Sequence, residues 1–282
     1  MRILNAMTVD VEDYYHVQAF AGVVRQSEWD LYPSRVERNT LRLLEIFAER
    51  QIRATFFVLG WVAEKCPGLV KAICAANHRL GCHSYAHRMI NTGDQRDFRD
   101  DLRRAKQAIE DRAGVAVTSF RAPSYSITAQ TLWALEILGE EGFDYDSSIF
   151  PIVHDNYGIP EAPRFPHVKT LRSGGQIKEF PPSTIRILGN NIPVAGGGYL
   201  RLFPYRITRW AIRHLNEAER QPAMVYLHPW EFDPDQPRIV APWRSRFRHY
   251  QNLKSTEAKC LKLLDDFSWA PMEEALAQGF VQ

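Results

Sequence analysis

Short apolar segments alternate with amphipathic segments along most of this chain, and no other feature constrains the fold as strongly. Extended segments are predicted at residues 3–7, 54–59, 115–120, 143–147 and 223–227. Helices are predicted at residues 34–51, 97–113, 128–141 and 206–216. Strands that alternate with helices are typical of parallel β/α units. Because polar residues follow most of these strands, the sequence predicts an α/β barrel with a functional site at the carboxyl rim.

Two segments lack this periodicity and are predicted to be mainly loops, with short extended pieces such as residues 177–180. Residues 149–198 are rich in proline and glycine, and residues 234–248 are rich in proline and arginine. Proline and glycine interrupt helices and strands, so such stretches favour irregular structure. A helix is expected again from about residue 256, followed by a short one after Pro271.

Three carboxylates, Asp10, Glu12 and Asp13, follow the first predicted strand within four residues. In an extended chain Asp10 and Glu12 point to the same side, because side chains alternate with a period of two. Two neighbouring acids are costly unless a cation or a proton-transfer role accounts for them. An acidic turn after an edge strand is the alternative.

His83 and His87 follow a short predicted strand and are four residues apart. On a helix or tight turn such a pair shares one face and can bind one metal ion, although the spacing alone is common. With a strand-end acid it forms a two-histidine, one-carboxylate set with open positions for water and substrate. We therefore predict one divalent metal held by Glu12, His83 and His87, with Asp13 as the alternative carboxylate. Zinc suits these ligands best, and cobalt or nickel would also fit.

The composition excludes several functional classes. With a net charge of +2 over 282 residues, the chain has no basic excess of the kind that nucleic-acid binding requires. No apolar run is long enough to span a membrane, and no signal-peptide pattern opens the sequence, so we expect no membrane insertion and a cytoplasmic location. The four cysteines show neither zinc-site nor disulfide spacing. No pattern predicts an oligomeric state.

Four motifs occur in order along the chain: Asp10-Val11-Glu12, His83-Ser84-Tyr85-Ala86-His87, Arg121-Ala122-Pro123 and Leu227-His228-Pro229. The series resembles the NodB-homology polysaccharide deacetylases, carbohydrate esterase family 4. The sequences of residues 10–16, 145–151, 196–201 and 228–231 resemble the branch associated with exosortase/PEP-CTERM exopolysaccharide loci. The resemblance spans residue 3 to about residue 275. It implies a distorted (β/α) barrel of about seven parallel strands, with residues 1–282 as one domain and about 229–282 as a family-specific extension.

The resemblance also implies a role for each matched residue. Asp10 would be the general base, oriented and tuned by Arg121, while Glu12, His83 and His87 would be the metal ligands. The usual signature has two adjacent aspartates, whereas here a valine separates the two acids and the second is a glutamate.

Three further roles concern the leaving group and the oxyanion. The backbone N–H of Ser124 would donate to the oxyanion, and His228 would be the general acid. Asp146 or Asp144 would orient His228. The tryptophan that usually accompanies the fourth motif is not evident beside Asp146.

The implied activity is metal-dependent removal of N-acetyl groups from N-acetylhexosamine units of an exopolysaccharide or its precursor. We assign Tyr125 and Trp230 to substrate binding, because aromatic faces on rim loops suit sugar rings and Trp230 lies two residues from His228. One alternative is a metal-dependent amidohydrolase acting on a small amide or a nucleotide sugar, which a narrow closed site would favour. The other is a saccharide-binding relic, which bound metal without hydrolysis would favour.

Overall fold

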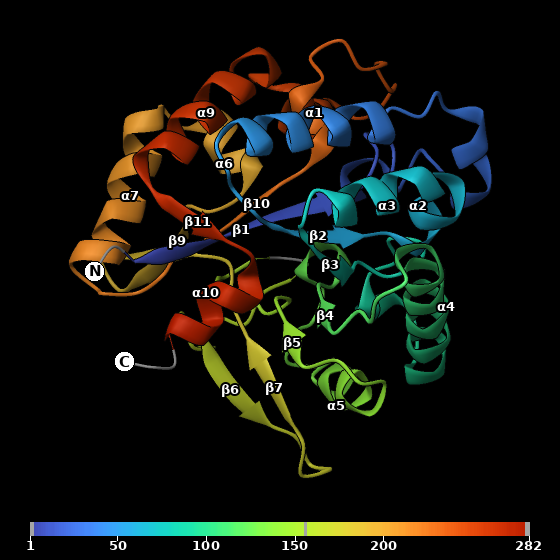
Figure 1. Cartoon of the computed structure of the whole chain (residues 1–282), viewed down its shortest axis with the longest axis horizontal. Coiled ribbons are helices and arrows are strands. Elements are labelled where there is room, and N and C mark those ends of the chain that lie inside the picture. Colours follow the sequence, from blue (N-terminus) through green and yellow to red (C-terminus); the bar gives the residue numbers. More distant parts are fainter. Residues whose placement is uncertain (1–2, 155–156, 280–282) are drawn as a thin grey trace.

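The computed structural model describes residues 3–154 and 157–279, so the predicted domain ends at residues 1 and 282 lie outside the described residues. A nine-stranded sheet runs through this described part of the chain (Figure 1). Seven of its strands are parallel neighbours in the order β10-β1-β2-β3-β4-β5-β7, β11 also pairs in parallel with the start of β1, and β6 is antiparallel to β7. The sheet is curled into a half-barrel, so the predicted α/β fold with about seven parallel strands is confirmed.

The strands of this sheet are β1 (Leu4–Val11), β2 (Thr55–Val58), β3 (Arg79–Cys82), β4 (Ser119–Phe120), β5 (Tyr145–Asp146), β6 (His167–Thr170), β7 (Gln176–Glu179), β10 (Met224–Leu227) and β11 (Ser268–Ala270). A separate hairpin pairs β8 (Thr184–Ile187) with β9 (Asn190–Pro193). The α-helices are α1 (Val36–Glu49), α2 (Gly60–Lys65), α3 (Pro67–Ala75), α4 (Gln95–Ala113), α5 (Trp133–Glu140), α6 (Gly197–Leu202), α7 (Tyr205–Glu217), α8 (Trp243–Tyr250), α9 (Thr256–Asp266) and α10 (Met272–Gly279).

β1 lies between β10 and β2 and has both faces covered, as expected for a strand inside a parallel sheet. Met7, Val9 and Val11 belong to the main hydrophobic core. The alternate residues form the inner face of the curled sheet, where Ala6 packs with α10 and Asp10 meets Arg121. The strand is longer than the predicted segment 3–7, because the arginine lets a carboxylate lie inside it.

The predicted helices mostly form where the apolar periodicity placed them. In α4 the side chain of Asp94 accepts a hydrogen bond from the Asp97 N–H (2.8 Å), and Gly114 ends the helix with a φ of 69°. α5 begins at Trp133 and not at residue 128 as predicted. The Thr131 hydroxyl oxygen accepts the backbone N–H of Thr128 at 2.8 Å, which holds the preceding residues in a turn.

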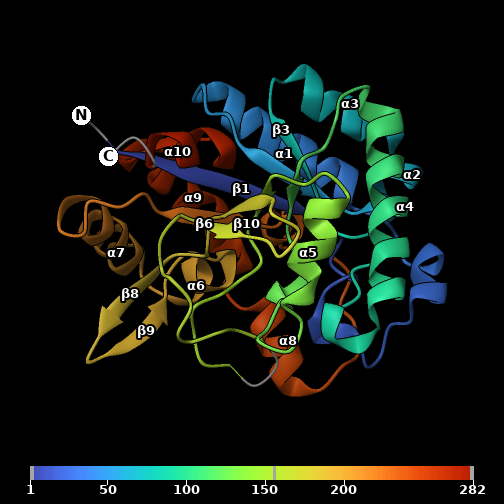
Figure 2. The same cartoon turned by 90° about the horizontal axis from the view of Figure 1, so that it is seen from below.

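The extended piece predicted at residues 177–180 is present as β7, but the loop predictions for the rest of residues 149–198 and for residues 234–248 are wrong in part. The first segment contains β6 to β9 and the start of α6, and the second contains most of α8. Each of these strands is only four residues long, and β6 is half exposed. A clear alternation of apolar and polar residues is therefore missing from β6 and β8. α8 buries only His249 within the helix, so it lacks an apolar stripe that a sequence pattern could reveal. In Figure 2 the β8–β9 hairpin lies beside α7, on the side of the molecule opposite α4.

Candidate metal centre

Glu12, His83 and His87 come together at the carboxyl edge of the sheet. Glu12 follows β1 and His83 follows β3, and one ligand atom from each of the three residues lies within 4.8 Å of the others. Glu12 and His83 are each 2% exposed and His87 is 9% exposed. The two histidines are joined by a turn and not a helix, with Ser84 and His87 at φ 64° and 52°. This turn brings the two imidazole rings close to Glu12, which the four-residue spacing alone did not establish.

The surroundings of His83 leave one ring nitrogen available to a metal. Its Nδ1 lies 2.8 Å from the backbone carbonyl of Arg121. Because a carbonyl only accepts hydrogen bonds, Nδ1 carries the proton and Nε2 keeps its lone pair. Burial lowers the pKa of His83 to about 4, so the ring is neutral at physiological pH.

Glu12 lies between His87 and Trp230. Its Oε2 lies 2.8 Å from His87 Nε2, and its Oε1 accepts a hydrogen bond from the Trp230 indole N–H at 3.1 Å. Burial alone would raise the pKa of Glu12, but attraction to His87, His228 and His83 lowers it well below its usual range. The carboxylate is therefore ionised, as a metal ligand must be.

Asp13, the alternative ligand, points elsewhere. Its Oδ2 accepts hydrogen bonds from the Ser34 hydroxyl at 2.9 Å and from the backbone N–H groups of Arg35 and Val36 at 2.6 and 3.0 Å. These donors lie at the amino end of α1, where free N–H groups and the helix dipole favour a negative charge. Glu12, and not Asp13, faces the histidines.

Asp10 forms a buried ion pair with Arg121, as predicted. Arg121 Nη1 lies 2.6 Å from Asp10 Oδ1, and the arginine is 0% exposed. The guanidinium also donates to the Thr8 hydroxyl (2.9 Å) and the Ser147 hydroxyl (3.0 Å). These bonds fix the guanidinium and, through it, the orientation of one carboxylate oxygen of Asp10.

His228, after β10, faces both acids. Its Nε2 lies 3.6 Å from Glu12 Oε1 and 3.9 Å from Asp10 Oδ2, and its Nδ1 lies 3.3 Å from Glu231 Oε2. Glu231 in turn pairs with the buried Arg201 at 3.0 Å. Burial alone would lower the pKa of His228, but Glu231 and the other two carboxylates raise it to about 9.

Glu231 takes the place predicted for Asp146 or Asp144, so that prediction is corrected. Asp146 is buried at the carboxyl end of β5, where its Oδ1 accepts a hydrogen bond from the Ser148 hydroxyl at 2.5 Å. Asp144 is exposed. The motif His-Pro-Trp-Glu holds the missed signal, because in a helical turn a residue and the third one after it lie on the same side.

The substrate-binding prediction for Trp230 also needs correction. The indole is 5% exposed and lies between the His228 ring (5.1 Å between centroids, 22° between planes) and the His249 ring (4.1 Å, 17°). With both faces covered it cannot stack on a sugar, and its N–H holds Glu12 instead.

The segment after β4 bends sharply beneath the site. Ser124 and Tyr125 both have a φ of 53°, in the left-handed region. Tyr125 is 6% exposed and packs against Phe150 and Tyr226, with ring centroids 5.2 and 5.0 Å away. Their roles in oxyanion and substrate binding stay predictions.

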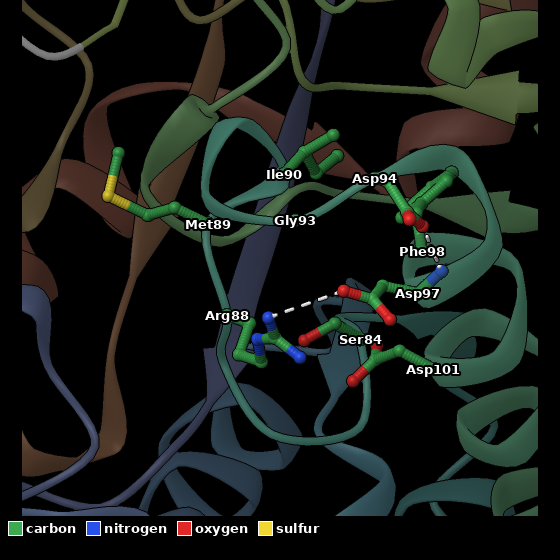
Figure 3. A pocket seen from close by; sticks show the side chains of 9 residues that line it. All are labelled: Ser84, Arg88, Met89, Ile90, Gly93, Asp94, Asp97, Phe98 and Asp101. Carbon is green, nitrogen blue, oxygen red and sulfur yellow. Dashed lines mark hydrogen bonds and ion pairs between the residues drawn. The ribbon is translucent and has the colours of Figure 1, made fainter.

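Two cavities flank the ligand turn. A cavity of about 280 Å³ beside His87 is lined by side chains that include Tyr15, His16 and Trp29. A second cavity, of about 20 Å³, is shown in Figure 3, where Arg88 reaches toward Asp97. That space fits about one water molecule. Asp101 on its wall accepts the Tyr85 N–H at 2.8 Å and so supports the turn that carries the two histidines.

A curled parallel sheet with two histidines, a carboxylate ligand and a neighbouring acid and base at its carboxyl edge defines a candidate metal-dependent hydrolase. Residues 28–142 match the family model described as polysaccharide deacetylase, and residues 147–277 match a domain of unknown function, DUF3473. The chain contains a polysaccharide deacetylase domain of the NodB type, carbohydrate esterase family 4.

Known relatives agree with this family. A peptidoglycan-N-acetylglucosamine deacetylase of Bacillus cereus is 32% identical over 98 residues, 34% of this chain and 36% of the relative. A chitin deacetylase of Colletotrichum lindemuthianum is 35% identical over 95 residues, 32% of this chain and 38% of the relative. The chain thus spans little more than a third of these curated relatives. The crystal structure of a putative polysaccharide deacetylase from Mycobacterium smegmatis has the same fold, with a TM-score of 0.62, 20% identity and coverage of 99% of this chain and 90% of that one.

Proposed function

We propose that the protein is a metal-dependent hydrolase that removes N-acetyl groups from N-acetylhexosamine units of an exopolysaccharide or its precursor. One observation carries the proposal. The ligand set Glu12, His83 and His87, the ion-paired Asp10 and the charged His228 converge at one edge of the sheet. The printed names of the relatives, which act on peptidoglycan and chitin, support an N-acetylglucosamine polymer as the substrate.

Glu12, His83 and His87 would hold one divalent metal, and the donor set suits zinc, with cobalt or nickel also possible. His83 keeps the Nε2 lone pair free, and Glu12 stays ionised. When bound, the metal would lower the pKa of a water molecule and polarise the acetyl oxygen.

Asp10 would accept the proton of the attacking water. Its Oδ1 is bound to Arg121 at 2.6 Å, so Oδ2, which faces His228 at 3.9 Å, is the oxygen left for proton transfer. Arg121 acts by orienting this carboxylate, and the backbone N–H of Ser124 would donate to the developing oxyanion.

His228 would protonate the sugar nitrogen as the carbon–nitrogen bond breaks. Without that proton the amine is a poor leaving group, and Glu231 keeps the ring charged at neutral pH. Addition of water across the bond then yields acetate and the free amino sugar.

Acetate release from a panel of N-acetylated and O-acetylated glycans tests the proposal. We expect release from N-acetylglucosamine oligomers, and Asp10→Asn should retain its metal while losing roughly 10²–10⁴-fold in rate. His83→Ala and His87→Ala should lose the metal, as elemental analysis would show. Full metal occupancy in both histidine variants would contradict the ligand assignment. Acetate release from small non-sugar amides alone would instead favour the amidohydrolase alternative.

A further inference from the structure

α8 presents large apolar side chains to solvent. Trp243 and Phe247 are 71% and 57% exposed, and Val240, three residues before the helix, is 91% exposed. Trp243 and Phe247 are four residues apart, so they lie on one face of the helix. Exposed aromatic side chains grouped in this way mark a contact surface more often than scattered ones do.

The same segment carries a concentrated positive charge. Arg238, Arg244, Arg246 and Arg248 are exposed, and the sequence contains no acidic residue between Asp235 and Glu257. Within the part of the chain that the structure describes, no carboxylate lies within 4.0 Å of these four guanidinium groups. Arg238 lies over the Tyr250 ring at 4.2 Å and Arg244 over the Trp243 ring at 5.5 Å, contacts that leave their positive charge without a neutralising carboxylate.

α7 provides the contrast. It also exposes a tryptophan, Trp210, which is 52% exposed. Two of its three arginines are paired, however, since Arg209 lies 2.8 Å from Asp266 and Arg213 lies 3.5 Å from Glu217, while the third, Arg206, is exposed. Around α8, exposed aromatic side chains are thus accompanied by four arginines without a carboxylate partner, whereas α7 has one such arginine, Arg206, among the described residues.

The inner side of α8 contacts the candidate metal centre through Trp230. His249 stacks on Trp230, the residue whose indole holds Glu12, and Tyr250 accepts the backbone N–H of Ile239 at 2.8 Å. The outward side chains therefore stand on a fixed base close to the site and do not belong to a loose loop.

We propose that the face formed by Val240, Trp243, Phe247 and the four arginines, here called the α8 face, docks on an anionic lipid membrane. A helix with arginines around Trp and Phe suits the membrane interface, where rings enter the headgroup region and guanidinium groups meet lipid phosphates. The exposed Val240 favours a lipid over a saccharide, because an aliphatic side chain gains from hydrocarbon but offers no flat face to a sugar.

Sedimentation with vesicles of phosphatidylglycerol and phosphatidylcholine, compared with phosphatidylcholine alone, tests the proposal. The wild-type chain should bind the anionic vesicles and be released by salt. Trp243→Ser combined with Phe247→Ser should weaken binding at least about tenfold. Arg244→Gln combined with Arg246→Gln should weaken it roughly thirtyfold at low salt. Trp210→Ser is the matched control and should bind as the wild type does.

Several outcomes would overturn the proposal. One is a wild-type chain that does not bind the anionic vesicles, and another is equal binding by the wild type and both double variants. A third is a double variant that keeps vesicle binding and loses affinity for a soluble acidic polysaccharide, which would make the α8 face a saccharide surface. Thermal melting of each variant checks that the substitutions leave the fold intact, and the two independent double variants guard against a folding defect in either.

Discussion

The carboxylate of Glu231, which faces His228 Nδ1, raises the pKa of the His228 ring. Glu231 lies 3.3 Å from Nδ1 and is itself fixed by Arg201, so the imidazolium is stabilised on the side away from Asp10 and Glu12. The sequence of contacts from Arg201 to Glu231 to His228 resembles the base-and-orienting-group arrangement of other hydrolases, in which a buried carboxylate fixes the ring. The position of His228, the proposed general acid, therefore depends on residues of the motif His-Pro-Trp-Glu and of the segment 196–201.

Glu231→Gln should move the basic limb of the pH–rate profile to lower pH by roughly one pH unit. A general acid must be protonated, so activity falls as pH rises through its pKa, and the pKa of His228 is about 9 with Glu231 in place. Removing the negative charge lowers that pKa, so the proton is lost earlier. The measurement is the pH dependence of kcat/KM, with Asp146→Asn as control. A basic limb that moves in the Asp146 variant instead would restore the original assignment.

Trp230→Phe should weaken zinc binding by roughly 10–100-fold. Phenylalanine keeps an aromatic ring between His228 and His249 but cannot donate to Glu12 Oε1, which the indole does at 3.1 Å. Competition with a chelator measures the affinity. Trp269→Phe is the matched control, because that indole donates to the carbonyl of Leu263 on another part of the molecule. Equal affinity in wild type and Trp230→Phe would mean that the indole does not support the ligand.

Among the sheet elements, β5 and β7 carry an unusual pair. Asp146 and Glu179 are neighbours in the parallel register, and both side chains are buried. Asp146 Oδ2 and Glu179 Oε2 find no donor in the described part of the chain, so a proton shared between them would satisfy both. Burial, and for Glu179 also the charge of Asp146, raises the pKa of each carboxyl group.

Glu179→Gln should make stability less dependent on pH. A carboxyl group with a raised folded-state pKa stabilises the fold fully below its unfolded pKa, and that contribution is lost as pH rises through the folded value. The wild-type melting temperature should therefore fall more steeply from acid to neutral pH than that of the variant. Thermal melts across this range provide the measurement, with the exposed Glu45→Gln as control. Parallel curves for wild type and Glu179→Gln would rule out the shared proton.

The sequence predicts the strand–helix alternation well and the contacts between distant elements poorly. β1, α1 and α4 have strong periodicity, because each buries a complete face. The short strands between residues 167 and 193 and the polar helix α8 have no such pattern, since tertiary contacts and not their own sequence stabilise them. Likewise, His83 and His87 were recognisable from spacing, whereas the burial of Trp230 depends on His249, which is nineteen residues away along the chain.

At the level of the whole chain, the candidate site combines three stretches. Asp10 and Glu12 precede the segment that matches the polysaccharide deacetylase model, His83 and His87 lie within it, and His228 lies in the segment that matches the domain of unknown function. Strands from all three stretches pair in one sheet. The interpretation of the chain as one domain, with an extension from about residue 229, stays a prediction. In the described residues every helix is too short or too polar to cross a bilayer.

A ligand shared by these stretches should stabilise the whole fold. Glu12 follows β1 and His83 follows β3, so a metal bound between them would favour the folded chain over the unfolded one. At a free zinc concentration about 100 times Kd, the gain is about 2.7 kcal/mol. For a chain of this size that corresponds to a rise in Tm of roughly 5 °C.

Calorimetry of the metal-free and zinc-saturated protein would measure this rise. His83→Ala should abolish it. His78→Ala is the matched control, since His78 is also buried but accepts the Ala54 N–H at 3.1 Å and is not one of the three ligand residues. That variant should melt at a lower temperature and still respond to zinc, because it loses packing while keeping the metal ligands. An equal zinc response in the His83 variant and the wild type would place the stabilising metal at another site, and the ligand assignment would then be wrong.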